Sequence, residues 1–202
     1  FHYPGHTEYL ASLVSPDTRP VMMLVCPGLR AVPVTIHMPL RQAIESLNSD
    51  AIVHCATVTA ESLIADFGIT APRIAISGLN PHAGEAGSLG TEEAEIIAPA
   101  IATLAAAGIA VEGPLPADSL FHEAARQAYD AVICMYHDQA LIPIKTIGFS
   151  RGINVTLGLP FIRTSPDHGT ALDIAGTGKA GEESLVAAIA TATAMARRRY
   201  HA

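Results

Sequence analysis

Apolar residues fall into two patterns along the chain: short continuous runs, and longer segments in which they repeat at helical spacing. Continuous runs are typical of strands that are buried on both faces of a sheet. Strands are therefore predicted at residues 21–25, 31–38, 73–76, 109–111, 131–135 and 153–157. Helices are predicted around Leu10 and Leu13, from Pro39 to Leu47, and at residues 51–67, 92–107, 120–129 and 182–198. Because strands, loops and helices alternate, the chain is predicted to be an α/β protein with a mainly parallel sheet and helices on both faces.

Polar residues gather directly after two of the apolar runs. Residues 131–135 are followed at once by Tyr-His-Asp-Gln at residues 136–139, and residues 73–76 are followed by a glycine-rich loop at 77–87. Open α/β sheets bind ligands at the carboxyl ends of their strands, so both segments are expected to carry chemistry. Pro143 is expected to keep the segment around it out of a helix.

Three histidines occupy comparable places in this pattern. His37 falls near the end of a predicted strand, on the face opposite its aliphatic residues, whereas His82 and His137 lie in the two loops that follow strands. Neutral imidazoles are common ligands of zinc and related ions, and three of them leave coordination positions open for a substrate. No local spacing motif joins them, and a histidine taken at random from the nine present is more often a surface group. The pattern alone leaves both interpretations open.

Charged and polar residues near the predicted strand ends are further candidates. Asp118 and Asp138 could act as metal ligands or as hydrogen-bond partners of ligand histidines, although Asp118 could equally be the N-cap of the next helix. Lys145, Asn154 and Arg163 lie after or between strand ends. A lysine and an arginine there suit a phosphate or a carboxylate, and a solvated surface charge is the alternative.

Composition narrows the classes of function. Half of the 202 residues are hydrophobic, so the chain can bury a sizeable core in one or two domains. The formal net charge of −7 argues against a nucleic-acid surface, since the only run of basic residues, 197–199, ends a predicted helix. No apolar run is long enough to span a membrane. The cysteines show no CxxC spacing, which favours buried, reduced thiols in a cytoplasmic protein; they are Cys26, Cys55 and Cys134.

Three segments together resemble the 4-hydroxythreonine-4-phosphate dehydrogenase family of vitamin B6 synthesis. They are Ser-Gly-Leu-Asn-Pro-His-Ala-Gly-Glu at residues 77–85, Met-Tyr-His-Asp-Gln at 135–139, and Asn-Val-Thr-Leu-Gly-Leu-Pro-Phe-Ile-Arg-Thr-Ser at 154–165. Gly-Pro-Leu-Pro-Ala-Asp at 113–118 fits as well. The resemblance covers essentially the whole chain and implies a fold related to that of the isocitrate and isopropylmalate dehydrogenases.

The resemblance implies roles for particular residues. The implied metal ligands are His37, His82 and His137, for an ion that is usually zinc, with magnesium or cobalt as alternatives. The implied substrate-binding residues are His6, Thr7, Lys145, Asn154 and Arg163, and the implied catalytic residues are Lys145, Asp118 and Asp138. Residues 168–176 resemble the adenosine-side cofactor loop of isopropylmalate dehydrogenases. That likeness implies that NAD or NADP is bound by Gly169, Thr170, Ala171 and Asp173.

The resemblance also implies how the protein is organised. Family members carry another α/β segment before the position of Phe1, so residues 1–180 are expected to form a metal- and substrate-binding, dimer-forming domain. Residues 181–202 are expected to be a helix that packs on the missing domain. A cytoplasmic homodimer with active sites at its interface is implied, acting on a small phosphorylated substrate. Ala86 and Ala140 stand where the family is expected to prefer glycine.

The implied reaction is NAD(P)-dependent, metal-assisted oxidation of 4-phosphohydroxy-L-threonine, followed by decarboxylation to 3-amino-2-oxopropyl phosphate. Relatives with the same histidines oxidise phosphorylated threonate or erythronate, or cyclic diols, and the shared motifs do not separate these substrates. Two alternatives belong to other classes. One is a non-catalytic, truncated metal-binding dimer module, and the other is a zinc hydrolase that needs only the three histidines and a water.

Overall fold

The computed structural model describes residues 6–15 and 17–201, without the side chains of His6, Glu8 and His201. Within these ranges seven strands form one sheet, in the order β4-β3-β5-β2-β1-β6-β7. The strands are β1 (Val21–Cys26), β2 (Leu29–Pro33), β3 (Arg73–Ser77), β4 (Ala110–Leu115), β5 (Ala131–Cys134), β6 (Ile153–Leu157) and β7 (Arg163–Pro166). The α-helices are α1 (His6–Val14), α2 (Leu40–Ser46), α3 (Ser49–Ala65), α4 (Ala98–Ala106), α5 (Glu123–Arg126), α6 (His137–Gly148) and α7 (Glu183–His201). Shorter helical turns are η1 (Pro81–Gly87), η2 (Glu93–Ile97), η3 (Ala117–Ser119) and η4 (Leu172–Ile174).

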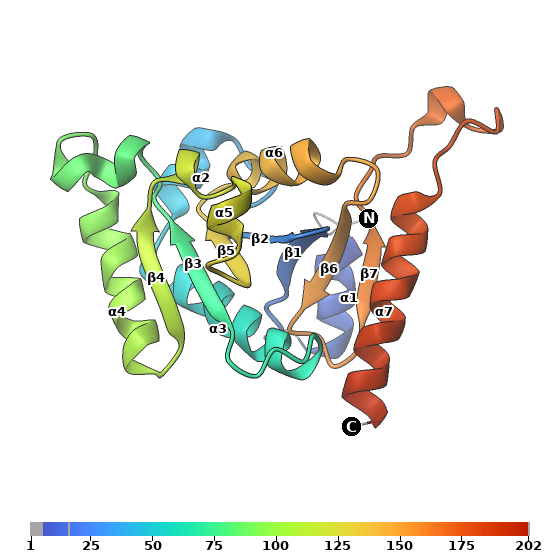
Figure 1. Ribbon diagram of the computed structural model, residues 1–202, viewed down its shortest axis with the longest axis horizontal. Helices are drawn as coiled ribbons and strands as arrows, with labels where there is room; N and C mark the ends of the chain where they lie inside the picture. The colour runs from blue at the N-terminus through green and yellow to red at the C-terminus, as the bar shows by residue number, and fades with distance from the viewer. Residues whose placement is uncertain (1–5, 16, 202) are drawn as a thin grey trace.

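The sheet has a parallel half and an antiparallel half (Figure 1). In the parallel half, β5 lies between β2 and β3, and β4 forms the outer edge. β1 pairs with β2 in an antiparallel hairpin, as the Pro27-Gly28 turn favours, and β6 and β7 add two more antiparallel pairings. β6 therefore runs in the same direction as β2. The predicted α/β fold with a mainly parallel sheet is confirmed, while β7 was not predicted.

Helices cover both faces of the sheet, as predicted. On β3, Ile74 and Ile76 join a core cluster that includes residues of α3, α4 and α7, whereas Ala75 joins a second cluster with residues of α6. This division follows from the alternation of side chains along a strand. Each fully buried large aliphatic side chain, such as Ile52 or Leu104, contributes about 1.5–3 kcal/mol of hydrophobic stabilisation.

α7 lies along β7 at one edge of the sheet (Figure 1) and is anchored at its carboxyl end. Arg199 donates from Nε and Nη2 to the two carboxylate oxygens of Asp66, both at 2.6 Å, and from Nη1 to the Leu159 carbonyl at 3.1 Å. Asp66 is only 1% exposed, so this forked pair neutralises a buried carboxylate. Arg199 therefore belongs to the fold and not to a basic binding surface.

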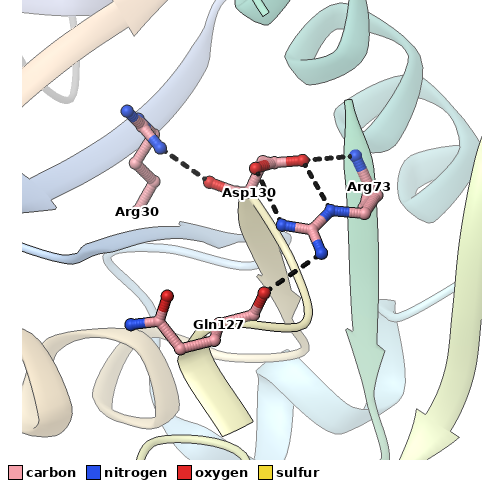
Figure 2. A network of polar contacts seen from close by, with 4 residues as sticks. All are labelled: Arg30, Arg73, Gln127 and Asp130. Carbon is pink, nitrogen blue, oxygen red and sulfur yellow. Dashed lines mark hydrogen bonds and ion pairs between the residues drawn. The ribbon is translucent and has the colours of Figure 1, made fainter. Parts of the chain in front are cut away.

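The amino ends of β2, β3 and β5 are joined by a network of arginines and one aspartate (Figure 2). The Asp130 carboxylate accepts from Arg73 N at 2.8 Å, Nε at 3.1 Å and Nη2 at 3.2 Å. The remaining Arg73 nitrogen, Nη1, donates to the Gln127 carbonyl at 3.0 Å. Arg30 Nη1 donates to the Asp130 carbonyl, also at 3.0 Å. The charges of Arg73 and Asp130 thus pair within the chain.

The strand predicted at residues 31–38 is shorter in the structure, because β2 ends at Pro33. Met38 N donates to the Ile36 carbonyl at 2.5 Å, which closes a tight turn around His37. His37 therefore lies in a turn after the strand and not on a strand face. The following Pro39 has the extended conformation of a residue that precedes a helix and is the N-cap of α2.

Pro143 lies inside α6, so the prediction that it excludes a helix was wrong. A proline at this position removes one intrahelical hydrogen bond, but a helix that is held by packing can tolerate the loss. Ala140, Pro143 and Ile144 are all buried, and Ala140 and Ile144 belong to the second core cluster. The stabilisation from packing the apolar face of α6 on the sheet is thus larger than the cost of the hydrogen bond that Pro143 removes.

The helix predicted at residues 120–129 is reduced to α5, and Asp118 is not its N-cap. The cap is His122, whose Nδ1 accepts from Ala125 N at 3.3 Å. The buried hydroxyl of Tyr129 donates to the Leu120 carbonyl at 2.8 Å, which holds Leu120 before the helix begins. Asp118 instead lies exposed in η3, where its carboxylate is available for another role.

Two expectations from composition can also be compared with the structure. The three cysteines are buried and unpaired, as predicted. Burial raises the pKa of the Cys55 thiol to about 11 and raises that of Cys134 further, so neither is a ready nucleophile. Among the described residues, no helix combines the length and the apolar character needed to cross a membrane.

Candidate metal and substrate site

Two of the three predicted metal ligands meet at the carboxyl ends of β2 and β5. Thr35, buried just beyond β2, donates to the carbonyl of Met135, just beyond β5, from its N–H at 3.3 Å and its hydroxyl at 2.9 Å. These bonds hold the two strand ends together where they leave the sheet. As a result, the rings of His37 and His137 lie with their centroids 5.7 Å apart and their planes tilted by 50°.

Among the described residues, His137 has a carboxylate partner on one ring nitrogen only. Its Nδ1 lies 2.7 Å from Asp138 Oδ1. Because an ionised carboxylate can only accept, Nδ1 carries the proton in the neutral ring and Nε2 keeps its lone pair. Metal-ligating histidines in proteins usually have this arrangement. The side chains of His137 and Asp138 are 33% and 68% exposed, so the contact orients the ring more than it stabilises the fold.

Two cavities adjoin at Asp138. The first, of about 230 Å³, is lined by His37, His137, Asp138 and the half-buried Tyr136. The second, of about 380 Å³, is lined by Asp118, Asp138 and apolar residues of α6. Asp138 therefore borders the cavity of the histidine pair, whereas Asp118 borders only the adjoining one.

His82 lies on a left-handed turn at the end of β3. Its φ is 53°, and the next four residues also have positive φ values, between 42° and 79°, although only Gly84 is a glycine. Each non-glycine residue in this conformation costs roughly 1–2 kcal/mol, and such strain gathers at functional sites. His82 is exposed. The described part of the chain holds no group of three His, Cys, Asp or Glu side chains arranged around one ion, so the third ligand stays a prediction.

The carboxylate of Glu93, which the sequence reasoning missed, accepts three hydrogen bonds from the start of this loop. Oε1 accepts from Leu79 N at 2.8 Å and Asn80 N at 2.7 Å, and Oε2 accepts from Asn80 Nδ2 at 2.9 Å. Burial by itself raises the pKa of Glu93, but the hydrogen bonds from Asn80 and from backbone N–H groups outweigh it and lower the pKa. Glu93 is therefore held as a buried, ionised acceptor.

Gln139 is a second buried polar residue that the sequence reasoning did not single out. Its Oε1 accepts from Ser77 Oγ at 2.8 Å and Met135 N at 2.7 Å, and its Nε2 donates to the Gly78 carbonyl at 2.8 Å. One side chain thus ties the end of β3, which leads to the His82 loop, to the end of β5, which leads to His137. The signal available in the sequence was a glutamine on the apolar face of the segment that forms α6.

Three of the predicted substrate-binding residues lie near the antiparallel half of the sheet: Thr7 on α1, Asn154 on β6 and Arg163 on β7. Arg163 Nη1 donates to Thr7 Oγ1 at 2.9 Å and to Thr156 Oγ1 at 2.8 Å. Asn154 and Thr156 are two positions apart on β6, so their side chains lie on the same face of the sheet. Within the described residues, the buried Oδ1 of Asn154 has no hydrogen-bond partner. The side chain of the predicted His6 lies outside the described residues.

Lys145 is paired within the chain. Its Nζ lies 2.8 Å from Asp167 Oδ2, also donates to the Asp167 carbonyl, and sits 5.6 Å from the centroid of the Phe149 ring. Asp167, a partner that sequence reasoning missed, directly precedes the predicted cofactor loop. Lys145 thus fixes the start of that loop, and it must exchange Asp167 for substrate if it is to bind an anion.

The predicted cofactor loop borders a cavity of about 480 Å³ next to Phe149 at the end of α6. Gly169, Thr170 and Ala171 line this cavity, and Ala171 has a φ of 43°. Asp173 is exposed in η4 and does not line it. Three of the four predicted residues therefore surround one space large enough for part of a nucleotide.

The mixed sheet and its strand-end groups define an α/β protein of the isocitrate/isopropylmalate dehydrogenase-like fold class. The chain belongs to the family described as "Pyridoxal phosphate biosynthetic protein PdxA", whose sequence pattern matches residues 1–192. The resemblance drawn from the sequence motifs is confirmed.

Individual relatives agree with this assignment. The chain is 63% identical over 199 residues to the 4-hydroxythreonine-4-phosphate dehydrogenase of Bradyrhizobium diazoefficiens, covering 97% of this chain and 58% of the relative. The crystal structure of 4-hydroxythreonine-4-phosphate dehydrogenase from Klebsiella pneumoniae is 47% identical, with a TM-score of 0.86, and the match covers 96% of this chain and 59% of that one. A terephthalate 1,2-cis-dihydrodiol dehydrogenase from Burkholderia xenovorans is 31% identical, with a TM-score of 0.77, and the match covers 94% and 60%. The chain thus spans about three fifths of the length of the relatives it matches.

Proposed function

We propose that the chain carries the metal- and substrate-binding part of an NAD(P)-dependent 4-hydroxythreonine-4-phosphate dehydrogenase. The proposed reaction is oxidation of 4-phosphohydroxy-L-threonine followed by decarboxylation to 3-amino-2-oxopropyl phosphate, a step of pyridoxal phosphate synthesis. The observation that supports it most is the pair of imidazoles of His37 and His137, 5.7 Å apart beside Asp138. The family of the chain and the names of its relatives favour this substrate.

The donors at the strand ends fit a divalent metal ion. Imidazole nitrogens suit zinc and cobalt better than magnesium, which prefers oxygen, so zinc is the first choice. His37 and His137 would hold the ion, with Asp138 fixing the tautomer of His137. When bound, such an ion lowers the pKa of a substrate hydroxyl and polarises a neighbouring carbonyl.

The third ligand is proposed to be His82 of a second copy of the chain. His82 is exposed on its turn, and the described residues of one chain do not add a third donor to the histidine pair. A homodimer with active sites at its interface follows from this proposal. In such a dimer the left-handed turn of one subunit enters the site of the other.

The guanidinium of Arg163 and the ammonium of Lys145 are proposed to bind the anionic ends of the substrate. Thr7 already bonds to Arg163, and the unsatisfied Oδ1 of Asn154 offers an acceptor on the same strand as Thr156, the other partner of Arg163. His6, next to Thr7 in the chain, is proposed to help hold the phosphate. A phosphate suits this group because forked N–H donors and hydroxyls match its oxygens.

Proton transfer and cofactor binding are assigned to neighbouring residues. Asp118 and Asp138 line the same cavity, and a carboxylate there can accept the proton that the substrate hydroxyl loses. NAD or NADP, when bound, supplies the acceptor for the hydride. The proposed cofactor-binding residues are Gly169, Thr170, Ala171 and Asp173.

The rest of the protein and its location are part of the proposal. The outward side chains of Leu185, Val186 and Ile189 on α7 are 50%, 58% and 58% exposed, an apolar surface that suits packing on a further domain. Residues 1–180 and 181–202 keep their predicted roles in that arrangement. Three buried, unpaired cysteines suit a reducing cytoplasm.

The deciding experiment supplies the intact gene product with 4-phosphohydroxy-L-threonine and each nicotinamide cofactor, and follows the absorbance of the reduced cofactor. We expect turnover that is lost in His82→Ala and His137→Ala and kept in His54→Ala, a histidine on α3 bonded to the Arg19 carbonyl. His82→Ala with full metal content and full turnover would contradict the proposal. Metal binding without turnover on any substrate would instead favour the non-catalytic module.

A second candidate is oxidation of a cyclic diol, because one solved relative is named a dihydrodiol dehydrogenase. The diol in that name, terephthalate dihydrodiol, carries carboxylates in place of a phosphate, and Arg163 suits either anion. Side-by-side kinetics of the wild type with 4-phosphohydroxy-L-threonine and with a cis-dihydrodiol of terephthalate therefore separate the two candidates. A larger kcat/KM for the phosphorylated substrate supports the first, and a larger kcat/KM for the diol supports the second.

A further inference from the structure

Glu93 is a buried carboxylate that no cation neutralises. It is 5% exposed, and none of the ion pairs among the described residues includes it. Its three hydrogen-bond donors all belong to Leu79 and Asn80, which only Pro81 separates from the left-handed turn. A buried charge is kept only where its hydrogen bonds are needed, so the bonds to this loop are the reason for a glutamate here.

The loop is shaped around this carboxylate. A Cβ added at Gly84 would lie 2.6 Å from Glu93 Oε2, and one added at Gly78 would lie 2.9 Å from Ala83 Cα and 3.2 Å from Glu93 Oε1. Two glycines therefore let the turn close directly onto Glu93. A left-handed run of this kind persists only where its surroundings determine it, and here they include Glu93 and also Glu92, whose Oε2 accepts from Asn80 Nδ2 at 2.7 Å.

The helix that carries Glu93 begins irregularly. η2 is a π-helical turn, in which one extra residue changes the direction in which side chains point. Its first residue, Glu93, is buried, whereas Glu95, two residues later, is exposed. The irregular turn thus directs one particular carboxylate under the loop and leaves a near neighbour in solvent, which supplies a natural control.

We propose that Glu93 is a positioning residue that fixes the direction of His82 and thereby the affinity of the metal site. Among the described residues, Glu93 forms no hydrogen bond or ion pair with His82. It acts through its bonds to Leu79 and Asn80, which fix the backbone two positions before His82. The inference rests on the metal-binding role proposed for His82.

The test is a titration of the full chain with Zn²⁺ by calorimetry, combined with amide hydrogen exchange over residues 77–90. Glu93→Ala is expected to weaken Zn²⁺ binding by about tenfold or more and to speed exchange at Leu79 and Asn80. Glu93→Gln keeps an acceptor oxygen for the two backbone donors and is expected to recover most of the affinity. Glu95→Ala is expected to match the wild type in both measurements.

Contrary outcomes separate this inference from the proposed function. If His82→Ala abolishes Zn²⁺ binding but Glu93→Ala leaves the affinity within about twofold, the positioning role is wrong and the metal site stands. If Glu93→Ala lowers only the Tm, its role is structural and the inference is also wrong. If His82→Ala binds Zn²⁺ like the wild type, the metal role itself fails and takes the inference with it. Should Glu93→Ala not fold, Asn80→Ala is compared with Glu92→Ala, because the Asn80 side chain donates to both Glu93 and Glu92. Binding that is weaker in Asn80→Ala than in Glu92→Ala supports the inference, and equal binding in the two variants overturns it.

Discussion

The two ends of the parallel strands use polar residues in opposite ways. At the amino end, Arg73 and Asp130 bond to one another, and the carbonyls of Gln127 and Asp130 accept one further donor each, from Arg73 and Arg30 (Figure 2). At the carboxyl end, no hydrogen bond within the described chain holds the ring nitrogens of His37, and His137 uses only its Nδ1. The closed network contributes to stability, whereas the open nitrogens are available to a ligand.

The carboxyl end is itself divided into two layers. Gln139 and Glu93 are buried, and their side chains bond to the strand ends and loops that lead to His82 and His137. An exposed ligand can hold a fixed position only if the backbone under it is fixed. Buried polar groups with hydrogen bonds, such as Gln139 and Glu93, therefore hold the backbone that carries the histidines. Substitutions of the buried groups and of the exposed groups test this division of roles.

The largest effect on stability is expected from Gln139→Ala. The substitution leaves Ser77 Oγ, Met135 N and the Gly78 carbonyl without their buried partner, and the free energy of unfolding should fall by about 3 kcal/mol. Chemical denaturation measures the change. Gln127→Ala is the matched control, because only its backbone carbonyl bonds to Arg73, and it should stay within about 0.5 kcal/mol of the wild type. Equal losses in the two variants would contradict the layered arrangement.

A smaller loss, about 2 kcal/mol, is expected from Asp130→Ala at the amino end, because a backbone N–H and a guanidinium lose their acceptor. The same change at the other end, Asp138→Ala, should cost less than about 0.5 kcal/mol, since that side chain is 68% exposed. Thermal unfolding of the two variants in parallel compares the ends directly. A greater loss in Asp138→Ala would reverse the contrast drawn here.

The contribution of Asp130 to the free energy of unfolding should depend on pH. Burial raises the pKa of this carboxyl, but hydrogen bonds and the charge of Arg73 outweigh it and hold the pKa below its ordinary value. The stabilisation is therefore complete above the ordinary pKa and is lost as pH falls through the lower, folded value. Unfolding free energies of the wild type and Asp130→Asn should differ by on the order of 1 kcal/mol at neutral pH and converge below about pH 4. A difference that grows on acidification would show that folding does not lower the pKa of Asp130.

The smallest effect on stability is expected from Asp138→Asn, which should leave the Tm of the metal-free protein unchanged. Its effect should be on binding, with Zn²⁺ affinity weakened by about tenfold, because the amide no longer fixes the Nδ1–H tautomer of His137. Glu123→Gln, an exposed carboxylate in the first turn of α5, is the control for loss of charge. Equal affinities in all three proteins would mean that Asp138 does not orient a ligand.

Much of the fold could be predicted because local pattern and tertiary structure agree. The run that forms β5 is apolar at every position, and all four of its residues are buried between parallel neighbours. The predictions failed where packing overrode local preference. Pro143 is held in α6 by the buried face around it, and β7, with the polar sequence Arg-Thr-Ser-Pro, is a strand only because it pairs with β6.

The candidate site was predictable at the level of strand ends and not at the level of hydrogen bonds. His37 and His137 meet because β2 and β5 are parallel neighbours. The order of elements predicts a parallel sheet, but not that these two strands, separated along the chain by β3 and β4, lie side by side. The roles of Glu93 and Asp167 depend on contacts with residues more than ten positions away, which no local pattern reveals. Lys145 stays a predicted functional residue, and its pairing with Asp167 could be found only from coordinates.

The central claim is that the strand-end imidazoles bind a divalent metal ion. Calorimetric titration of the metal-free chain with Zn²⁺, in the wild type, His37→Ala and the control His54→Ala, tests it most directly. One saturable site is expected in the wild type and in His54→Ala, and an affinity at least about 100-fold weaker is expected in His37→Ala, with an unchanged Tm. Zn²⁺ binding of equal strength in all three proteins would show that these imidazoles do not hold the ion.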